Sequence, residues 1–197
     1  MTGLTRRTVL SALATAPLWT QMAWAQTTAL KISHQFPGGT VSEGDFRDRL
    51  VRMFAAEVDK RSKGALKFEI YPGSSLMKTN AQFSAMRKGA LDLSLVPLSY
   101  AGGEVPEVNI GLMPGLVTSY DQGYGWKTAE VGKELHRILQ EKGIVVLSWI
   151  WQAGGVASRS KPIVEPEDAA GMKVRGGSRE MDLILKAAGA AVVTLPS

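Results

Sequence analysis

The 197-residue sequence contains no cysteine. It therefore cannot form disulfides, thiolate zinc sites or cysteine nucleophiles. The sequence also lacks a large excess of charge of one sign, since it has 23 Lys and Arg and 18 Asp and Glu, which gives a formal net charge of +5. Arg6 and Arg7 lie in an N-terminal segment that we expect to be removed, and the remaining surplus of about +3 is too small to indicate a nucleic-acid partner.

The common signatures of catalysis are missing as well. There is no Gly-x-Ser-x-Gly elbow, no His-Glu-x-x-His pair and no phosphate-binding Gly-x-x-x-x-Gly-Lys loop. Only two histidines occur, His34 and His136. Most carboxylates lie near Lys or Arg at helical spacing, as Glu57 does with Lys60, which is typical of surface ion pairs. We therefore do not expect an enzyme.

The first 25 residues have the pattern of an export signal. Arg6 and Arg7 precede an uncharged stretch, 8–25, that closes with a small-x-small sequence ending at Ala25. The apolar middle is short and is interrupted by Pro17, which favours a cleaved signal over the alternative of a membrane anchor. Residues around the arginine pair also resemble the twin-arginine signal, which exports folded proteins. We expect cleavage after about Ala25 and a periplasmic location.

Beyond this segment, strand-like and helix-like patterns alternate. We expect strands at 29–33, 66–70, 91–96, 144–150, 155–159, 172–175 and 190–195, and helices at 42–64, 80–88, 120–142 and 179–188. Residues 144–150 are the most strongly β-like of these. On the first helix, the residues that fall on one face are Phe46, Leu50, Met53, Phe54 and Val58. Strands alternating with helices predict an α/β fold with a largely parallel sheet.

Several polar side chains follow predicted strands, at the edge where open α/β sheets bind small ligands. The candidate ligand-binding residues are His34, Tyr100, Gln152 and Arg175. Arg175 precedes two glycines, which we expect to leave the backbone open, and a guanidinium can hold a carboxylate through two parallel hydrogen bonds. Its alternative role is a salt bridge to a neighbour such as Glu180. For the other three, a structural hydrogen bond stands as an equal alternative.

Four stretches of the sequence match the pattern of a known family. They are the strand and helix within 30–58, the corner Phe68–Leu76, the helix-Gly-strand unit Met86–Leu93, and Pro166–Arg175. The last is the most specific, because it ends in a Gly-x-Lys-x-Arg unit. Together they resemble the solute-binding proteins of tripartite ATP-independent periplasmic (TRAP) transporters, the DctP family.

The resemblance implies a periplasmic-binding-protein-like fold with two α/β lobes. Residues 26–148 would form lobe I, and residues 149–197 would form the first part of lobe II. Family members have roughly twice this mature length, so we expect both lobes to be incomplete and the chain to be truncated near residues 192–197, where the family begins a returning helix. A strand that lacks its neighbour would leave its backbone groups unpaired.

The resemblance also implies roles for individual residues. Arg175 would clamp a ligand carboxylate, and Tyr100 matches an aromatic residue that lines the cleft. Gln152 resembles the glutamine that, in keto-acid receptors, helps to hold a metal ion beside the substrate; no cofactor is otherwise implied, and the metal ligands are not identified by the sequence. The implied partners are a small organic acid and the permease subunits of a TRAP transporter.

Two alternatives remain open at this point. One is a periplasmic receptor of another transporter class, for instance one that feeds an ATP-driven importer. The other is a non-functional truncated remnant. The Gly171–Arg175 unit favours the TRAP interpretation over the first alternative. The identity of the acid is beyond the sequence.

Overall fold

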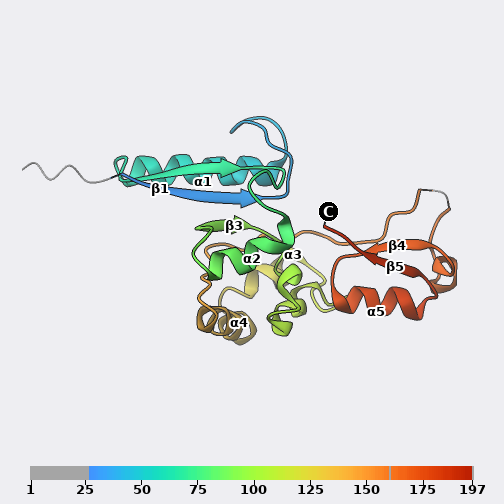
Figure 1. Ribbon diagram of the computed structural model, residues 1–197. Coiled ribbons are helices and arrows are strands. Elements are labelled where there is room, and N and C mark those ends of the chain that lie inside the picture. The colour runs from blue at the N-terminus through green and yellow to red at the C-terminus, as the bar shows by residue number, and fades with distance from the viewer. Residues whose placement is uncertain (1–26, 160, 197) are drawn as a thin grey trace, which may run out of the picture.

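The computed structural model describes residues 27–159 and 161–196, and the predicted signal at 1–25 lies outside them. Two parallel sheets organise this part of the chain (Figure 1). A larger unit contains three strands and most of the helices, and a smaller C-terminal unit contains two strands and one α-helix. No described helix combines the length and the apolar character needed to cross a membrane.

The three-stranded sheet forms from local units that the sequence predicts. Its strands are β1 (Thr28–His34), β2 (Leu66–Tyr71) and β3 (Leu93–Leu95), all parallel in the order β2-β1-β3. The register places Ile32 opposite Ile70 on one side and Leu93 on the other. Parallel neighbours need a crossover, and α1 (Phe46–Arg61) and α2 (Thr79–Arg87) provide the two connections.

Helix α1 starts later than the sequence predicts. We expected it to begin at Ser42, but the backbone becomes helical at Phe46. The reason is local, because Asp45 has extended backbone angles and its carboxylate accepts the N–H of Arg47, which caps the helix there.

The predicted helix at 120–142 is two helices, α3 (Tyr120–Gly125) and α4 (Glu130–Glu141). Trp126 lies between them and is only 6% exposed. Burying this indole turns the chain, and α4 then begins after Ala129, whose backbone is extended. Helix α4 ends as predicted at Gly143, which takes a positive φ of 80°. Two 3₁₀ helices, η1 (Leu98–Ala101) and η2 (Pro106–Leu112), precede this pair.

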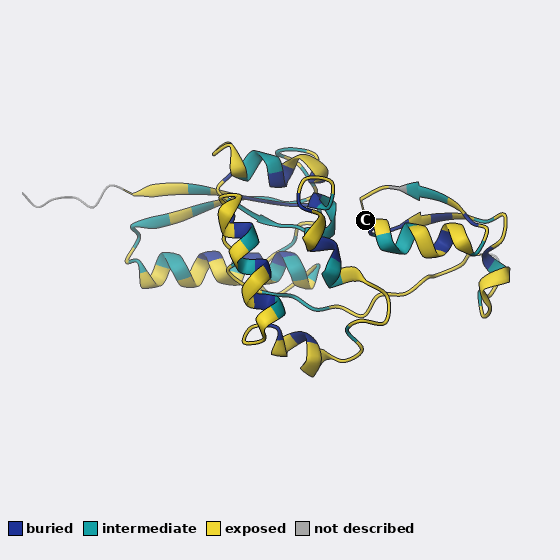
Figure 2. Cartoon of the chain, turned by 90° about the horizontal axis from the view of Figure 1, so that it is seen from below, coloured by how far each residue is buried: buried dark blue, intermediate teal, exposed yellow. Residues whose placement is uncertain are grey.

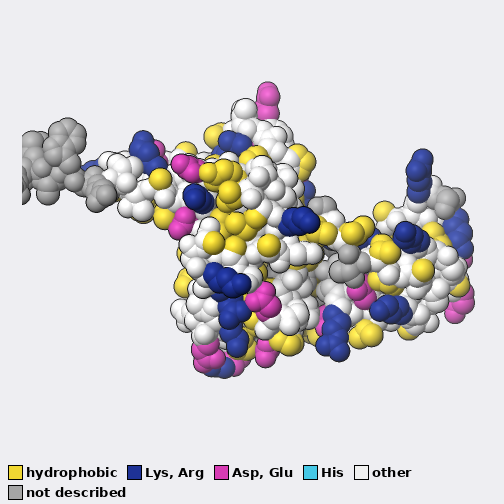
Figure 3. Space-filling model, viewed as in Figure 1, with side chains coloured by type: hydrophobic (Ala, Val, Ile, Leu, Met, Phe, Trp, Pro, Cys, Tyr) yellow, Lys and Arg dark blue, Asp and Glu magenta, His cyan; other side chains and the backbone are white. Residues whose placement is uncertain are grey.

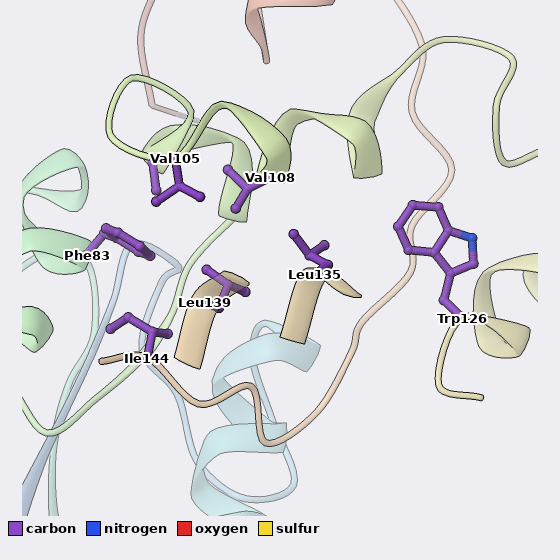
Figure 4. Close-up of a cluster of buried hydrophobic side chains, with 8 residues drawn as sticks. Phe83, Val105, Val108, Trp126, Leu135, Leu139 and Ile144 are labelled. Carbon is purple, nitrogen blue, oxygen red and sulfur yellow. The ribbon is translucent and has the colours of Figure 1, made fainter. Parts of the chain in front are cut away.

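The main core of the larger unit lies between these helices. Its buried members are Phe83, Ala101, Val105, Val108, Trp126, Leu135, Leu139 and Ile144 (Figure 4). Leu139 is fully buried at the centre of the inward face of α4. The core therefore fixes η1 and η2 against α4, and η1 carries one of the predicted site residues, Tyr100.

The C-terminal unit has its own small core. Strands β4 (Lys173–Gly176) and β5 (Ala191–Thr194) form a parallel pair. Helix α5 (Arg179–Ala187) connects them, and the 3₁₀ helix η3 (Pro166–Ala169) precedes β4. Its buried residues are Ala169, Val174, Leu185 and Ala190. Figures 1 and 2 both show this unit beside the larger one, connected by a long stretch of irregular chain.

Two predicted strands, 144–150 and 155–159, do not form in the described chain. Val145 and Leu147 are 63% and 66% exposed, despite their strong β propensity. A strand needs a neighbour for its backbone hydrogen bonds, and no described strand pairs with this segment. Trp149 and Trp151, at the end of this segment, are partly buried and both pack against the main core. The predicted lobe boundary at 148/149 stays a prediction.

Candidate functional site

A pocket of about 390 Å³ lies where the two units meet. The larger unit lines it with Asn80, Ser99 and Tyr100, and the C-terminal unit with residues that include Arg179, Asp182 and Lys186. These three lie on one side of α5, at spacings of three and four residues. Figure 3 shows several Lys and Arg side chains on the C-terminal unit. The C-terminal side of the pocket thus carries two cations and one carboxylate, and the other side carries neutral polar groups.

Arg175 and Tyr100, two of the predicted site residues, meet at this junction. Arg175 lies on β4, and its Nη2 donates a hydrogen bond to the hydroxyl of Tyr100 at 2.6 Å. Its Nε donates to the backbone carbonyl of Leu195 at 2.8 Å. The side chain is exposed, and within the described chain no carboxylate forms an ion pair with it. The alternative role, a salt bridge with Glu180, is therefore not realised here.

A second hydrogen bond also joins η1 to the C-terminal unit. The Ser99 hydroxyl donates to the carbonyl of Gly177 at 3.0 Å. Together with the contact between Arg175 and Tyr100, it links η1 to the turn that follows β4. Gly176, the last residue of β4, is close-packed, since a Cβ on it would overlap Oδ1 of Asp182, whereas a Cβ on Gly177 would meet only Nη1 of Arg175 at 3.7 Å.

His34 lies elsewhere and is fully buried at the end of β1. Its Nε2 is 3.1 Å from Oδ1 of Asp48, whose Oδ2 accepts hydrogen bonds from Arg52 Nε at 2.7 Å and from the Gly39 N–H at 2.8 Å. The structure thus realises the structural hydrogen bond that the sequence held open for His34. The pocket beside Arg175 includes neither His34 nor its partners.

Burial and hydrogen bonding set the protonation of this network. Burial lowers the pKa of His34 below its ordinary value, and the nearby Asp48 only partly offsets this. Burial alone would raise the pKa of Asp48, but the hydrogen bonds from Arg52 and Gly39 outweigh it, so the pKa of Asp48 is lowered. At neutral pH we therefore expect a neutral imidazole beside an ionised carboxylate.

Gln152 is exposed in the irregular segment between the units. It does not line the pocket beside Arg175. Nor do the described residues supply a ligand set for the metal ion that the resemblance associates with Gln152, because no three His, Asp or Glu side chains gather among them. The structure thus brings Arg175 and Tyr100 together, and leaves Gln152 and His34 apart from them.

Some groups at the junction were missed by the sequence analysis. The Ser99 hydroxyl could have been noticed, since it directly precedes Tyr100 after a predicted strand. The carbonyl of Leu195 carries no signal at all, because every residue has a carbonyl and only the pairing of β5 with β4 brings this one to Arg175.

Comparisons with known proteins bear on this arrangement. The model of the bacterial extracellular solute-binding proteins, family 7, matches residues 38–197. A solute-binding protein of Albidiferax ferrireducens is 80% identical over 185 residues, which is 94% of this chain and 55% of the relative. The 2,3-diketo-L-gulonate-binding periplasmic protein of Escherichia coli is 28% identical over 81% of this chain and 49% of its own.

Solved structures give the same picture. A TRAP periplasmic solute-binding protein from Rhodoferax ferrireducens with bound malonate superposes with a TM-score of 0.82 at 83% identity, covering 85% of this chain and 53% of that one. A TRAP solute-binding protein from Sulfurospirillum deleyianum with bound succinate superposes with a TM-score of 0.76 at 28% identity, covering 87% and 54%. The chain therefore has the periplasmic-binding-protein fold and spans about half the length of these relatives.

Proposed function

We propose that this chain binds a small organic acid between its two units. The chain belongs to family 7 of the bacterial extracellular solute-binding proteins, and the proposal starts from this membership. The acid would be captured in the periplasm and handed to the permease subunits of a TRAP transporter. The names of the relatives support this proposal, since the solved structures include TRAP receptors with malonate and succinate bound. We propose a receptor rather than an enzyme.

The guanidinium of Arg175 carries the proposal. Its Nη2 and Nε donate to Tyr100 and to the Leu195 carbonyl, and among the described residues no ion pair involves its Nη1. Nη1 lies toward the turn after β4, 3.7 Å from where a Cβ on Gly177 would be. A carboxylate approaching this edge would form charge-assisted hydrogen bonds, which strengthen as water is excluded from the junction.

Closure of the two units on the acid would complete the mechanism. Tyr100 on one unit already contacts Arg175 on β4 of the other, and Ser99 contacts Gly177 after β4, so the junction can form without ligand. A ligand that binds both units favours the closed arrangement by its difference in affinity for the two states. The permease would then receive the closed form.

The test is a thermal-shift screen of carboxylic and sulfonic acids, with and without sodium or divalent ions, followed by calorimetry. The screen uses this chain and a hybrid in which the matched region of the 80% identical relative is replaced by residues of this chain. Arg175→Ala should weaken binding by about 3 kcal/mol or more, because a buried carboxylate would lose its partner. Arg159→Ala is the matched control, because this exposed arginine, like Arg175, is not among the residues that line the pocket and, unlike Arg175, has no hydrogen bond to Tyr100.

Two results would contradict the proposal. Unchanged affinity of the Arg175→Ala variant would remove this residue from the site. The absence of a shift with any acid, in both proteins, would favour the alternative of a non-functional remnant. A shift in the hybrid alone would mean that the acid site needs the part of the relative that this chain does not span.

A further inference from the structure

A second pocket, of about 450 Å³, lies within the larger unit. It is formed by the first half of α4, by the residues directly before this helix, and by the irregular segment after it. No described residue lines both this pocket and the one at the junction of the two units. Its volume is typical of small-molecule sites, which span roughly 300–1,000 Å³. We call it the tryptophan pocket, and its aromatic and cationic lining residues are Trp126, Lys127, Lys133, His136 and Trp149.

The aromatic rings at this pocket are fixed by their neighbours. The imidazole of His136 stacks on the indole of Trp149, with 5.8 Å between the ring centroids and 25° between the ring planes. Trp149 also stacks with Trp151 at 6.3 Å, and Trp126 meets Trp151 edge-on at 5.1 Å. Trp151 packs tightly on α3, since a Cβ on Gly123 would lie 2.7 Å from its ring. The aromatic wall is therefore preorganised, which lowers the entropy cost of binding a ligand.

The charged side chains that line the tryptophan pocket are cations. Lys127 and Lys133 are exposed, and no Asp or Glu is among the described residues of the lining. Nζ of Lys133 lies 2.7 Å from Oε1 of Glu130, and Nζ of Lys127 lies 5.7 Å from the centroid of the Tyr124 ring. Exposed contacts of these kinds are weak. Both ammonium groups can therefore turn toward an anion in the pocket.

The imidazole of His136 is a second, independent indication of an occupant. Its Nε2 is shielded from solvent and has no hydrogen-bond partner among the described residues. Shielded polar atoms are nearly always paired, because an unpaired one loses its hydration without compensation. This part of the wall is therefore completed by a group that the described chain does not itself supply.

We propose that the tryptophan pocket is a second ligand site and that it binds a small aromatic carboxylate. The ligand ring packs against the indoles of Trp126 and Trp149, and such aromatic pairs have centroid distances of roughly 4.5–7 Å. Its carboxylate lies between the ammonium groups of Lys127 and Lys133 and accepts charge-assisted hydrogen bonds from them. The proposal rests on these residues and not on the proposed function at Arg175.

A sugar acid or a short aliphatic acid is the weaker occupant. The hydroxyl groups of a sugar need hydrogen-bond partners, and among the lining residues Ser148 has the one side-chain hydroxyl. A short aliphatic acid would leave most of the aromatic wall without a contact. A planar aromatic ring instead buries apolar surface against both indoles.

Intrinsic fluorescence reports on this pocket directly. Three of the five tryptophans are Trp126, Trp149 and Trp151, and the other two lie outside the described residues. The full chain with Trp19→Phe and Trp24→Phe therefore emits from this cluster alone. A ligand that stacks on these indoles should change that emission.

Benzoate is the probe, and two analogues are its controls. Benzamide keeps the ring and lacks the charge, whereas cyclohexanecarboxylate keeps the charge and lacks the planar ring. We expect benzoate to quench the emission saturably, with a dissociation constant about tenfold or more below that of either analogue. Calorimetry repeats the titrations without an optical signal.

Two pairs of lysine substitutions test the cations. Lys127→Gln combined with Lys133→Gln should raise the dissociation constant of benzoate about tenfold or more, because the carboxylate loses both charged donors. Lys88→Gln combined with Lys142→Gln removes the same charge outside the pocket and should change the constant less than twofold. All four side chains are exposed, so we expect both variants to fold.

Other outcomes overturn the proposal. Absence of saturable quenching by benzoate, in a protein that circular dichroism shows to be folded, would remove the site. Equal affinity for benzoate and either analogue, or an equal effect of the two lysine pairs, would refute the chemistry assigned to it. Loss of the benzoate signal in Arg175→Ala would assign benzoate to the junction instead. Failure of acid binding at Arg175 would leave the benzoate titration unchanged, so the two proposals fail separately.

Discussion

At the scale of single residues, one histidine illustrates how position decides role. His34 follows a strand, as ligand-binding residues often do, yet it is fully buried and contacts Asp48. Asp48 in turn binds Arg52 and the Gly39 N–H, so the network ties the end of β1 to the first turns of α1. A buried network of this kind is stabilising only while each member keeps its protonation state.

The His34 network predicts a pH dependence of stability. Burial lowers the pKa of His34, so the unfolded chain takes up a proton below about pH 6.5 while the folded chain resists it. The free energy of unfolding should therefore fall as the pH drops from about 7 through 6.5 and below. Urea titrations between about pH 7.5 and 5.5 measure it. His34→Gln should flatten this slope, His136→Gln should retain it, and a slope unchanged in His34→Gln would disprove the assignment.

Tyr100 gives a prediction about binding. Tyr100→Phe keeps the ring but removes the oxygen that accepts the 2.6 Å hydrogen bond from Arg175. The guanidinium would then be held only by the Leu195 carbonyl, and acid binding should weaken by about 1 kcal/mol, roughly fivefold. Calorimetry measures it, with Tyr120→Phe on exposed α3 as the control. If Tyr100→Phe lost as much affinity for the acid as Arg175→Ala, Tyr100 would contact the acid directly.

At the scale of elements, the break between α3 and α4 shows what periodicity alone misses. The pattern across 120–142 is helical throughout, but the buried Trp126 interrupts it. The close approach is visible at Gly132, where a Cβ would lie 1.8 Å from the carbonyl oxygen of Trp126. The first turn of α4 is therefore held against the interrupting residue, and only glycine fits there.

This contact reverses the usual effect of a glycine-to-alanine change. Inside a helix, alanine is ordinarily better than glycine by about 1 kcal/mol. Gly132→Ala should instead destabilise the protein by about 1–3 kcal/mol, because the methyl group collides with backbone that cannot move freely. Gly125→Ala at the end of α3, where a Cβ meets nothing within 4 Å, is the control and should be close to neutral. Thermal unfolding would compare them, and a stabilised Gly132→Ala would refute the packing argument.

At the scale of the whole molecule, two units with separate cores meet through few contacts. The main core ends near Trp151 and the small core begins near Ile163. The residues described between them form no helix or strand and are largely exposed. Two side-chain hydrogen bonds, from Ser99 and Arg175, cross the junction. The connecting segment is therefore the least protected stretch of ordered chain.

Limited proteolysis should reveal this division. Trypsin should cut first at Arg159, which is exposed in the connecting segment, and yield a fragment of the larger unit. Arg137, although also exposed, is paired with Glu134 and Glu141 within α4 and should resist. Mass spectrometry of early time points identifies the cut, and Arg159→Gln should delay the main cleavage. A first cut within α4 or α1 would show that the larger unit opens before the connection does.

Local patterns in the sequence by themselves determined most of the elements. Alternation predicted β1 and β2, because the side-chain period of a strand is a property of neighbouring residues, and short strand-like segments predicted β4 and β5. The place of Arg175 on a strand that leads into two glycines was also evident. Its role in binding stays a prediction.

Only the tertiary structure decided which side chains meet. Tyr100 and Arg175 are 75 residues apart, and packing of one core against another unit brings them together. The strand predicted at 144–150 fails for the same kind of reason, since strand formation depends on a neighbour and not on propensity alone. Period and capping act within a few residues, whereas burial and pairing depend on the whole fold, and it was these long-range terms that buried His34 and left Met53 of α1 exposed.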